Sequence, residues 1–394
     1  MLTTEMNIAD QIKEKYFQKF GNADDTNKPR IFRSPGRINL IGEHTDYNNG
    51  FVLPASVDKA VYYVISPRSD NQVILHAADL DETYTFSLDD LSKPEISWPQ
   101  YQIGVVDQIQ KAGKKIGGFQ TTFGGDVPVG AGMSSSAALE CCLLFGLSEI
   151  FDLKLDRFTI VKMGQKVENE YVGVQSGIMD QFASVFGKEE SVIRLDCRSL
   201  EYEYFPFLMK DYLLVLCDTS VKHSLASSEY NTRRLECEKG VAILQKYHPE
   251  IKSLRDASPE IVAQHQEELG DVVYRRCKFM TEEILRVQEA CDFLVQGDME
   301  NFGKEMYATH NGLQHEYEVS CEELDFLVEQ TLDNSDVLGA RMMGGGFGGC
   351  TINLVKIDAV EDFEKDMKMA YKDQFNIDLP CYRVKITNGT EELK

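Results

Sequence analysis

One stretch constrains this chain more than any other: a glycine- and serine-rich segment that leads into an apolar helix. It reads Pro128-Val-Gly-Ala-Gly-Met-Ser-Ser-Ser-Ala-Ala138, and the apolar helical run continues from Ala137 to Phe151. The two glycines allow a tight turn and a close approach of the backbone to a ligand, and the serines predict a helix N-terminus. Free N–H groups and the positive end of the helix dipole favour phosphate there. The segment lacks the Gly-Lys-Ser/Thr ending of a Walker A loop. An ordinary loop that caps a core helix is the alternative interpretation.

A second polar cluster lies nearly a hundred residues earlier. Residues 38–41 predict a short strand, and Glu43, His44 and Asp46 follow it within four residues, with Arg37 just upstream. Carboxylates and an imidazole are suitable partners for sugar hydroxyls, which both donate and accept hydrogen bonds. The cluster therefore indicates a sugar site, and a polar turn between strands is the alternative.

Composition limits the classes of function. The 394 residues are enough for two domains, and 43% of them are hydrophobic, so a sizeable core is possible. The formal net charge of -23 argues against binding to nucleic acid or to an anionic membrane. The start of the chain has no signal-peptide pattern, and no apolar run is long enough to span a bilayer. The ten cysteines form no CxxC pair and the seven histidines have no metal-ligand spacing, which indicates reduced thiols in a cytoplasmic protein.

The apolar spacing predicts mixed helices and strands along the chain. Helices are expected over 8–20, 99–112, 157–172, 178–186 and 360–372, and in most of 230–332, where His310 and His315 are expected to be structural. Antiparallel strands are expected over 60–65, 72–76 and 83–87, and further strands over 119–123, 192–195, 212–217, 350–355 and 381–387. The polar tail 388–394 is expected to fray.

Two acidic residues and a second glycine-rich run complete the candidates. Spacing alone places Glu168 on a solvated helix face, and Asp180 is an acidic residue in the first turn of its helix, where such residues are common. Residues 344–349 contain five glycines in six positions. This run indicates a backbone that something approaches closely, with a flexible hairpin as the alternative.

Three separated motifs together carry a resemblance to a known family. Gly36-Arg-Ile-Asn-Leu-Ile-Gly-Glu-His-Thr-Asp-Tyr-Asn48 resembles the sugar-binding signature of galactokinases. The 128–137 segment is similar to the ATP-binding signature of the GHMP kinases, the wider family of galactose, homoserine, mevalonate and phosphomevalonate kinases, and 339–350 is similar to their third motif. The resemblance implies an α+β, two-domain GHMP kinase fold, and the protein is expected to be a monomer. Residues 1–205 would form a ribosomal S5 domain 2-like N-terminal domain and 206–394 a ferredoxin-like C-terminal domain, with the active site between them.

The resemblance also implies an activity and residue roles, in place of the surface interpretations of Glu168 and Asp180. The activity is transfer of the γ-phosphate of ATP, with Mg²⁺, to the C1 hydroxyl of α-D-galactose. Asp180 matches the catalytic base, and Arg37 matches the arginine that stabilises the transition state. The sugar-binding residues are Glu43, His44, Thr45, Asp46, Gly177 and Tyr230. The ATP-binding residues are Gly130, Ala131, Gly132, Met133, Ser134, Ser135 and Ser136, and the Mg²⁺ ligands are Ser136 and Glu168.

The chain departs from the family pattern in two places, and alternatives remain. Met343 stands where the family usually has threonine, and 309–321 differs from the usual galactokinase segment, but neither change touches the proposed chemistry. A kinase of N-acetylgalactosamine or a related hexose would carry the same first motif. A non-catalytic galactose sensor is disfavoured because the Ser134–Ala138 run, Arg37 and Asp180 are intact. An unspecified α/β nucleotide-binding protein would leave the 36–48 cluster unexplained.

Overall fold

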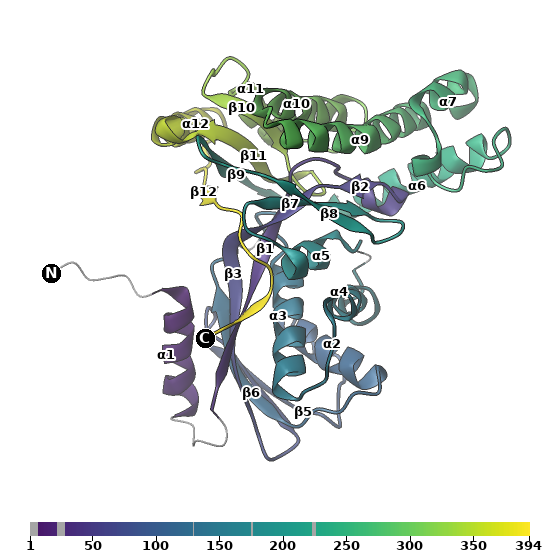
Figure 1. Ribbon diagram of the computed structural model, residues 1–394. Helices are drawn as coiled ribbons and strands as arrows, with labels where there is room; N and C mark the ends of the chain where they lie inside the picture. The colour runs from purple at the N-terminus through teal and green to yellow at the C-terminus, as the bar shows by residue number, and fades with distance from the viewer. Residues whose placement is uncertain (1–6, 22–27, 129, 175, 223–225) are drawn as a thin grey trace.

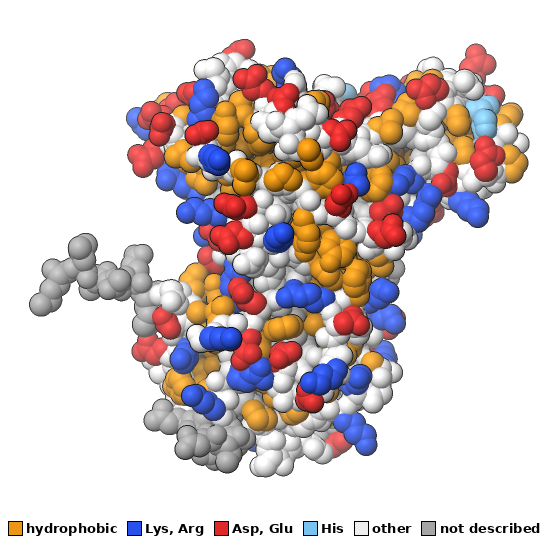
Figure 2. All heavy atoms as spheres, viewed as in Figure 1, with side chains coloured by type: hydrophobic (Ala, Val, Ile, Leu, Met, Phe, Trp, Pro, Cys, Tyr) orange, Lys and Arg blue, Asp and Glu red, His pale blue; other side chains and the backbone are white. Residues whose placement is uncertain are grey.

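The computed structural model describes residues 7–21, 28–128, 130–174, 176–222 and 226–394. Figure 1 shows two lobes: the first half of the chain builds the lower lobe, and most of the second half builds the upper one. Acidic and basic side chains are interspersed over both lobes on the face in Figure 2. No helix in the described ranges is long and apolar enough to cross a membrane.

The lower lobe contains a six-stranded sheet in the order β13-β1-β3-β6-β4-β5. Its strands are β1 (Arg30–Asn39), β3 (Pro54–Pro67), β4 (Gln72–Ala77), β5 (Glu82–Ser87), β6 (Phe119–Gly125) and β13 (Glu391–Leu393). Neighbouring strands are antiparallel except β4 and β6, which are parallel. The expected antiparallel strands over 60–87 are confirmed as β3, β4 and β5, and β6 lies between β3 and β4 as the parallel partner of β4. The connection between β5 and β6 contains a helix and is long enough for β6 to return into the middle of the sheet.

Helices cover both faces of this sheet. The first, α1 (Ile8–Phe20), packs on one face through Ile12 and Tyr16. The opposite face carries α3 (Ser135–Ile150), which has few polar positions and is buried on most sides. A Cβ at Gly146 would lie 2.8 Å from the Ile65 side chain, so this glycine allows α3 to lie close to the sheet. The other helices of this layer are α2 (Trp98–Lys111), α4 (Arg157–Lys166) and α5 (Met179–Phe186).

The end of the predicted helix 157–172 differs from a regular α-helix. After α4 the chain continues as a π-helix, η2 (Val167–Val172), which ends at Gly173 with a φ of 96°. π-helical turns widen the backbone ring and are frequent at functional sites. Here the turn carries Glu168.

A small sheet joins the lobes. It contains β2 (Phe51–Val52), β7 (Ser191–Asp196) and β8 (Tyr202–Pro206), and helix α9 (Asp271–Gln296) of the upper lobe contacts β2 and β8. A short 3-10 turn, η1 (Asp46–Asn48), precedes β2.

The upper lobe contains a four-stranded antiparallel sheet in the order β10-β11-β9-β12. In chain order β9 is the first strand and β12 the last, with helices after the first and third strands, which is the ferredoxin-like β-α-β-β-α-β arrangement. The strands are β9 (Tyr212–Lys222), β10 (Val337–Met342), β11 (Gly348–Lys356) and β12 (Cys381–Val384). The expected helical zone is confirmed: its elements are α6 (Ala226–Leu244), η3 (Leu254–Asp256), α7 (Pro259–Gln264), α8 (Gln266–Leu269), α9 (Asp271–Gln296), α10 (Met299–His315) and α11 (Glu322–Glu329). The last turn and helix are η4 (Ile357–Ala359) and α12 (Val360–Phe375).

The expectation that the tail frays is wrong. Residues 391–393 form β13 at the edge of the lower sheet, where Glu392 pairs with Phe32 of β1. The Arg30 guanidinium donates two hydrogen bonds, of 2.7 and 2.6 Å, to the Glu392 carboxylate. Thr390 is fully buried. The edge of β1 supplies backbone partners that a polar sequence by itself does not reveal.

Candidate active site

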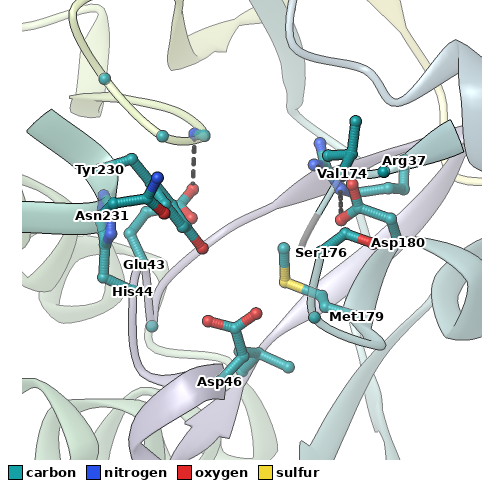
Figure 3. A pocket seen from close by; sticks show the side chains of 17 residues that line it. Arg37, Glu43, His44, Asp46, Val174, Ser176, Met179, Asp180, Tyr230 and Asn231 are labelled. Atoms are coloured by element: carbon teal, nitrogen blue, oxygen red, sulfur yellow. Dashed lines mark hydrogen bonds and ion pairs between the residues drawn. The ribbon is translucent and has the colours of Figure 1, made fainter. Parts of the chain in front are cut away.

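The candidate site is a cavity of about 560 Å³ to which both lobes contribute. Figure 3 shows Arg37 and Asp180 on one side, Glu43, His44, Tyr230 and Asn231 on the other, and the Asp46 carboxylate directed into the space between them. The glycine loop that begins at Gly344 forms a further part of its wall. The cavity therefore joins four stretches of the chain: 37–52, 173–180, 230–231 and 344–346.

Arg37 and Asp180 form a two-pronged ion pair at one end of the cavity. The Nε atom of Arg37 donates to Oδ1 of Asp180 at 2.7 Å, and Nη2 donates to Oδ2 at 2.9 Å. The Ser134 hydroxyl also donates to Oδ2. Burial acts to lower the pKa of Arg37, but the charge and hydrogen bonds of Asp180 outweigh it, so the pKa is raised. Because Oδ1 receives one donor and Oδ2 receives two, Oδ1 is the oxygen with more capacity to accept a further proton.

The glycine-serine loop lies against the same arginine. The Arg37 amide donates to the Met133 carbonyl at 3.0 Å, and its guanidinium donates to the Gly132 carbonyl. Gly130, Gly132 and Ser134 have φ values of 88°, 74° and 54°, so the loop adopts left-handed backbone at three positions. Helix α3 begins after Ser134 without a side-chain cap. The first backbone amides of α3 have no acceptor within the helix and form the positive end of the helix dipole. This end of the helix therefore suits an anion.

Ser136 and Glu168 meet beside this loop. The Ser136 hydroxyl donates to Oε1 of Glu168 at 2.8 Å, and only 7% of Glu168 is exposed. Burial raises the pKa of Glu168, and the nearby charge of Asp180 raises it further. A buried carboxylate next to a hydroxyl is stabilised by a hard cation, and Mg²⁺ takes few protein ligands because it retains water and phosphate oxygens. These two residues therefore fit Mg²⁺. Among the described residues there is no group of three or more histidine, cysteine or acidic side chains able to hold a metal.

Glu43 is held by the third motif. Its Oε1 accepts from Nη2 of Arg341 at 2.6 Å and from the Gly344 amide at 2.9 Å. Arg341 is fully buried on β10 and also donates to the Asn39 carbonyl at 2.9 Å. Both donors reach one oxygen of Glu43, so Oε2 is left for a ligand in the cavity. The alternative of a flexible hairpin for this motif is wrong, because the glycine loop fixes a carboxylate.

His44 contributes a neutral imidazole. Burial lowers the pKa of His44 to about 4, although the charge of Glu43 opposes this shift. Its backbone has a φ of 63°, an uncommon conformation for a residue other than glycine. The ring lies 5.2 Å from the Tyr230 ring, and Tyr230 lines the same cavity. Such local strain is maintained by surrounding structure and is typical of functional positions.

Asp46 and Gly177 are in close contact. A Cβ added at Gly177 would lie 2.0 Å from Oδ2 of Asp46. Burial raises the pKa of Asp46 to about 6, and the charges of Asp180 and Glu43 act in the same direction. Only a residue without a side chain allows Asp46 to occupy this position, so Gly177 determines where the carboxylate lies.

The predicted residues that line the cavity are Arg37, Glu43, His44, Asp46, Gly177, Asp180 and Tyr230. The 130–136 loop and Glu168 lie outside its lining, and within the loop Ala131 and Met133 are buried. Thr45 does not line the cavity either. Its hydroxyl donates to the Gly42 and Phe51 carbonyls and is buried. A sugar contact through the Thr45 side chain therefore does not fit its position, and the residue instead holds the turn between β1 and β2.

Several site residues were missed by sequence reasoning. Val174, Met179 and Asn231 line the cavity, and Arg341 and Tyr317 lie directly behind it. Asn231 follows the predicted sugar contact Tyr230 directly in the sequence, and this adjacency could have identified it as a site residue. Met343, the departure in the third motif, is 1% exposed, and His310 of the altered 309–321 segment accepts from the Met342 amide at 3.2 Å. His310 is therefore structural, as expected.

Comparisons with known proteins show which family the chain resembles. Family models match as GHMP kinases N terminal domain over 100–188, galactokinase galactose-binding signature over 14–67, and GHMP kinases C terminal over 289–372. The chain is 40% identical to a galactokinase of Thermotoga neapolitana over 362 residues, which covers 92% of this chain and 99% of the relative. It is 38% identical to a galactokinase of Roseiflexus over 379 residues, covering 96% of both.

Solved structures give the same result. The crystal structure of Lactococcus lactis galactokinase complexed with galactose has a TM-score of 0.92 at 36% identity and covers 98% of this chain and 100% of that one. The mevalonate kinase of Methanococcus jannaschii has a TM-score of 0.67 at 18% identity, covering 92% of this chain and 99% of that one. At that identity the second likeness supports the fold alone.

Proposed function

Because the chain belongs to the galactokinase family of the GHMP kinases, we propose that it transfers the γ-phosphate of ATP to the C1 hydroxyl of α-D-galactose, giving α-D-galactose 1-phosphate and ADP. One observation carries this proposal. The Arg37–Asp180 pair lies at one end of a cavity whose other end holds Glu43 and His44, and the Asp46 carboxylate is directed into the space between them. A sugar bound by Glu43 and His44 presents a hydroxyl to the Arg37–Asp180 pair.

Phosphoryl transfer depends mainly on positioning and on neutralisation of charge. Asp180 accepts the proton of the attacking hydroxyl through Oδ1, the oxygen with fewer donors. Arg37 orients Asp180, and its guanidinium stabilises negative charge that develops on the transferring group. The loop 130–136 and the N-terminus of α3 hold the phosphates of ATP. Mg²⁺, held by Ser136 and Glu168, supplies charge neutralisation when it is bound.

The side chains of the sugar site have different hydrogen-bonding roles. Oε2 of Glu43 and the Asp46 carboxylate accept hydrogen bonds from sugar hydroxyls, and His44 and Tyr230 complete the contacts. Gly177 sets the position of Asp46 through its missing side chain. Thr45 contributes by holding the turn.

The proposal also covers the oligomeric state, the localisation and the domain boundary. We infer that the protein is a monomer, because one chain supplies both ends of the site. We also infer that it is cytoplasmic, because all ten cysteines, which lie in the described part of the chain, are free thiols. We divide the chain into domains at 205/206, with β13 returning to the sheet of the first domain.

The decisive experiment is an ADP-release assay with ATP, Mg²⁺ and a panel of acceptors: galactose, N-acetylgalactosamine, glucose and mevalonate. We expect galactose to give the highest kcat/KM, with the phosphate on C1 of the product by ³¹P–¹H NMR. Preference for N-acetylgalactosamine would reassign the substrate. Binding of galactose and ATP without ADP release would indicate a sensor, and activity with mevalonate alone would overturn the sugar site.

A further inference from the structure

Two thiols face each other across neighbouring strands of the upper sheet. Sγ of Cys217 on β9 lies 3.8 Å from Sγ of Cys381 on β12. The two residues are direct partners in the antiparallel register of these strands. Cys217 is fully buried, and Cys381 is partly exposed. Both pack on the face of the sheet that α11 and α12 cover, and neither lines the cavity of the candidate active site.

The position of this pair in the sheet suits a covalent bond. Opposite residues of antiparallel strands alternate between hydrogen-bonded and non-hydrogen-bonded positions, and in the second kind the Cα atoms are only about 4.5 Å apart. The Asp218 amide donates to the Pro380 carbonyl at 2.9 Å, so the neighbouring pair, Cys217 and Cys381, occupies a non-hydrogen-bonded position. A Cα separation of about 4.5 Å lies within the range that disulfides span. The two sulfur atoms can therefore be joined by side-chain rotation, without movement of either strand.

A third cysteine of the same sheet lies on its other face. In the register of β9 and β11, Cys350 pairs with Asp218, one residue away from the position opposite Cys217. Successive side chains of a strand point to opposite faces of the sheet. Cys350 accordingly packs in the large core that both lobes share, and Cys217 packs in the core beneath α11 and α12. The sheet therefore separates Cys350 from the pair.

Cys381 has the properties of the thiol that reacts first with an oxidant. A hydrogen bond from the Cys217 thiol lowers the pKa of Cys381, and although burial opposes this shift, the charge of Lys368 supports it. Each of the other nine cysteines, all of which the structure describes, has a raised pKa. The thiolate is the reactive form of cysteine. Cys381 thus combines thiolate character with partial exposure, and Cys217 lies directly behind it.

A bond between these thiols would act on the segment that connects the lobes at the C-terminus. Figure 1 shows the yellow chain passing from β12 in the upper lobe to the lower lobe. We call residues 381–393 the C-terminal strap. Its lower part is held along the first domain, because the Asp58 amide donates to the Lys385 carbonyl at 2.9 Å and residues 391–393 pair with β1. Its upper end is the four-residue strand β12 at the edge of the sheet.

We propose that Cys217 and Cys381 form a reversible disulfide when the protein meets hydrogen peroxide, and that this bond fastens the C-terminal strap to the upper sheet. The pair is thus a modification site outside the active site. Because cytoplasmic thiols are kept reduced, such a bond is transient and forms only under oxidising conditions. The inference does not depend on the identity of the substrate.

The oxidation proceeds in two steps. The Cys381 thiolate attacks one oxygen of the peroxide, the O–O bond breaks, and hydroxide leaves and takes up a proton to give water. Sγ of Cys217 then attacks the sulfenic acid on Cys381: the S–S bond forms, the S–O bond breaks, and a second water leaves with the Cys217 proton. The two thiols together lose two electrons, and one peroxide is reduced to two waters. Thiol–disulfide exchange with a dithiol reductant restores both thiols.

Peptide mapping tests the pairing. Native protein without substrates is treated with hydrogen peroxide, the remaining thiols are blocked with N-ethylmaleimide, and the peptides are analysed by mass spectrometry. We expect a disulfide between the peptides that carry Cys217 and Cys381, and its loss after treatment with dithiothreitol. N-ethylmaleimide on both residues, a sulfinic acid on Cys381 without the disulfide, or a link from either residue to a different cysteine would overturn the proposal.

Two variants test the order of the steps. In Cys217→Ala the sulfenic acid of Cys381 has no thiol to attack it, so we expect dimedone, a reagent for sulfenic acids, to label Cys381. In Cys381→Ser the buried Cys217 should remain a thiol under the same treatment. Dimedone on Cys217, or on neither residue, would overturn the assignment of Cys381 as the thiol that reacts first.

Thermal unfolding connects the bond to the strap. A bond between Cys217 and Cys381 closes a long loop in the unfolded chain, so we expect peroxide to raise the midpoint of thermal unfolding by roughly 4–8 °C. Cys381→Ser should lose this rise. Cys350→Ala is the matched control: it removes a fully buried cysteine from the neighbouring strand and should keep the rise. A disulfide that forms without any rise would overturn its role in fastening the strap.

Discussion

Arg341 and Glu43 form an ion pair of 2.6 Å in which Arg341 is fully buried. The two residues are almost three hundred positions apart, and their contact joins the third motif to the sugar-binding segment. The Gly344 amide, which follows on the same loop, donates to the same carboxylate oxygen. The glycine-rich run therefore acts on the sugar side of the site, where it fixes the orientation of Glu43.

The first prediction concerns this pair. We expect Arg341→Met to destabilise the protein by about 3–5 kcal/mol, because it leaves the charge of Glu43 buried without its partner. Urea unfolding of native and variant protein measures the change. The KM for galactose should rise, because Glu43 loses its fixed position. The double variant Glu43→Gln/Arg341→Met should recover part of the stability and none of the sugar affinity. A variant with native stability would contradict the argument.

The sequence predicted the local parts of this site better than its long-range contacts. Glu43 could be assigned from a short polar motif whose chemistry suits a sugar, whereas the roles of Arg37 and Asp180 came only from the resemblance to the family. Arg341 could not be assigned, because its role depends on β10 lying beside the end of β1. The glycine-rich run 344–349 predicts that another group approaches its backbone closely, but it does not identify that group as Glu43.

The same limit applies to the fold. Helix α1 was predicted with its observed bounds, since Asn7 accepts from the Asp10 amide at the helix start and the apolar spacing is regular. Strand β13 was missed because its residues are polar and its partner is the edge of β1. The π-helical turn at Glu168 was read as ordinary helix, since sequence spacing does not reveal where a backbone ring widens.

The second prediction concerns pH. Burial raises the pKa of Asp46 to about 6. The carboxylate accepts from the sugar only when ionised, so the KM for galactose should rise as the pH falls through about 6. Initial rates between pH 5 and 8 at saturating ATP measure this dependence. A KM that stays constant over that range would contradict the role of Asp46.

The same shift predicts a stability effect of Asp46→Asn. A carboxyl whose folded pKa lies above its unfolded value destabilises the fold once it is ionised, so the cost is complete above pH 6 and disappears toward pH 4. We expect Asp46→Asn to gain about 1–3 kcal/mol of stability at pH 7.5 and little at pH 4 while it loses sugar affinity. Denaturant unfolding at both pH values checks this, and an equal effect at the two values would argue against a buried charge.

The third prediction concerns Gly177. An added Cβ would lie 2.0 Å from Oδ2 of Asp46, so Gly177→Ala must displace that carboxylate. We expect the KM for galactose to rise at least about tenfold, the effect of losing one or more hydrogen bonds to a charged group. Gly117→Ala is the control, because its Cβ would meet the Phe151 ring at an ordinary 3.4 Å. Equal KM values in the two variants would show that Gly177 does not set the position of Asp46.

The fourth prediction concerns the metal. If Ser136 and Glu168 hold Mg²⁺, Glu168→Gln should weaken Mg²⁺-dependent binding of ATP more than Ser136→Ala, because it removes the negative charge. Isothermal titration with ATP in the presence and absence of Mg²⁺ measures binding without turnover. The matched control is Glu170→Gln, two residues further along the π-helical turn, which should bind as the native protein does. Native Mg²⁺ dependence in Glu168→Gln would remove this residue from the metal site.

The last prediction concerns the base. Asp180→Asn preserves size and keeps one acceptor oxygen for Arg37, so we expect the fold and the binding of galactose and ATP to persist. The amide cannot accept the hydroxyl proton, and kcat should fall by about 10²–10⁴-fold. Asp126→Asn is the matched control, since Asp126 pairs with Lys59 at 3.2 Å and its side chain is 27% exposed, against 29% for Asp180. That variant breaks a comparable ion pair away from the cavity and should retain turnover. Near-native turnover in Asp180→Asn, with binding intact, would mean that the proton leaves by another route and that Asp180 serves only to orient Arg37.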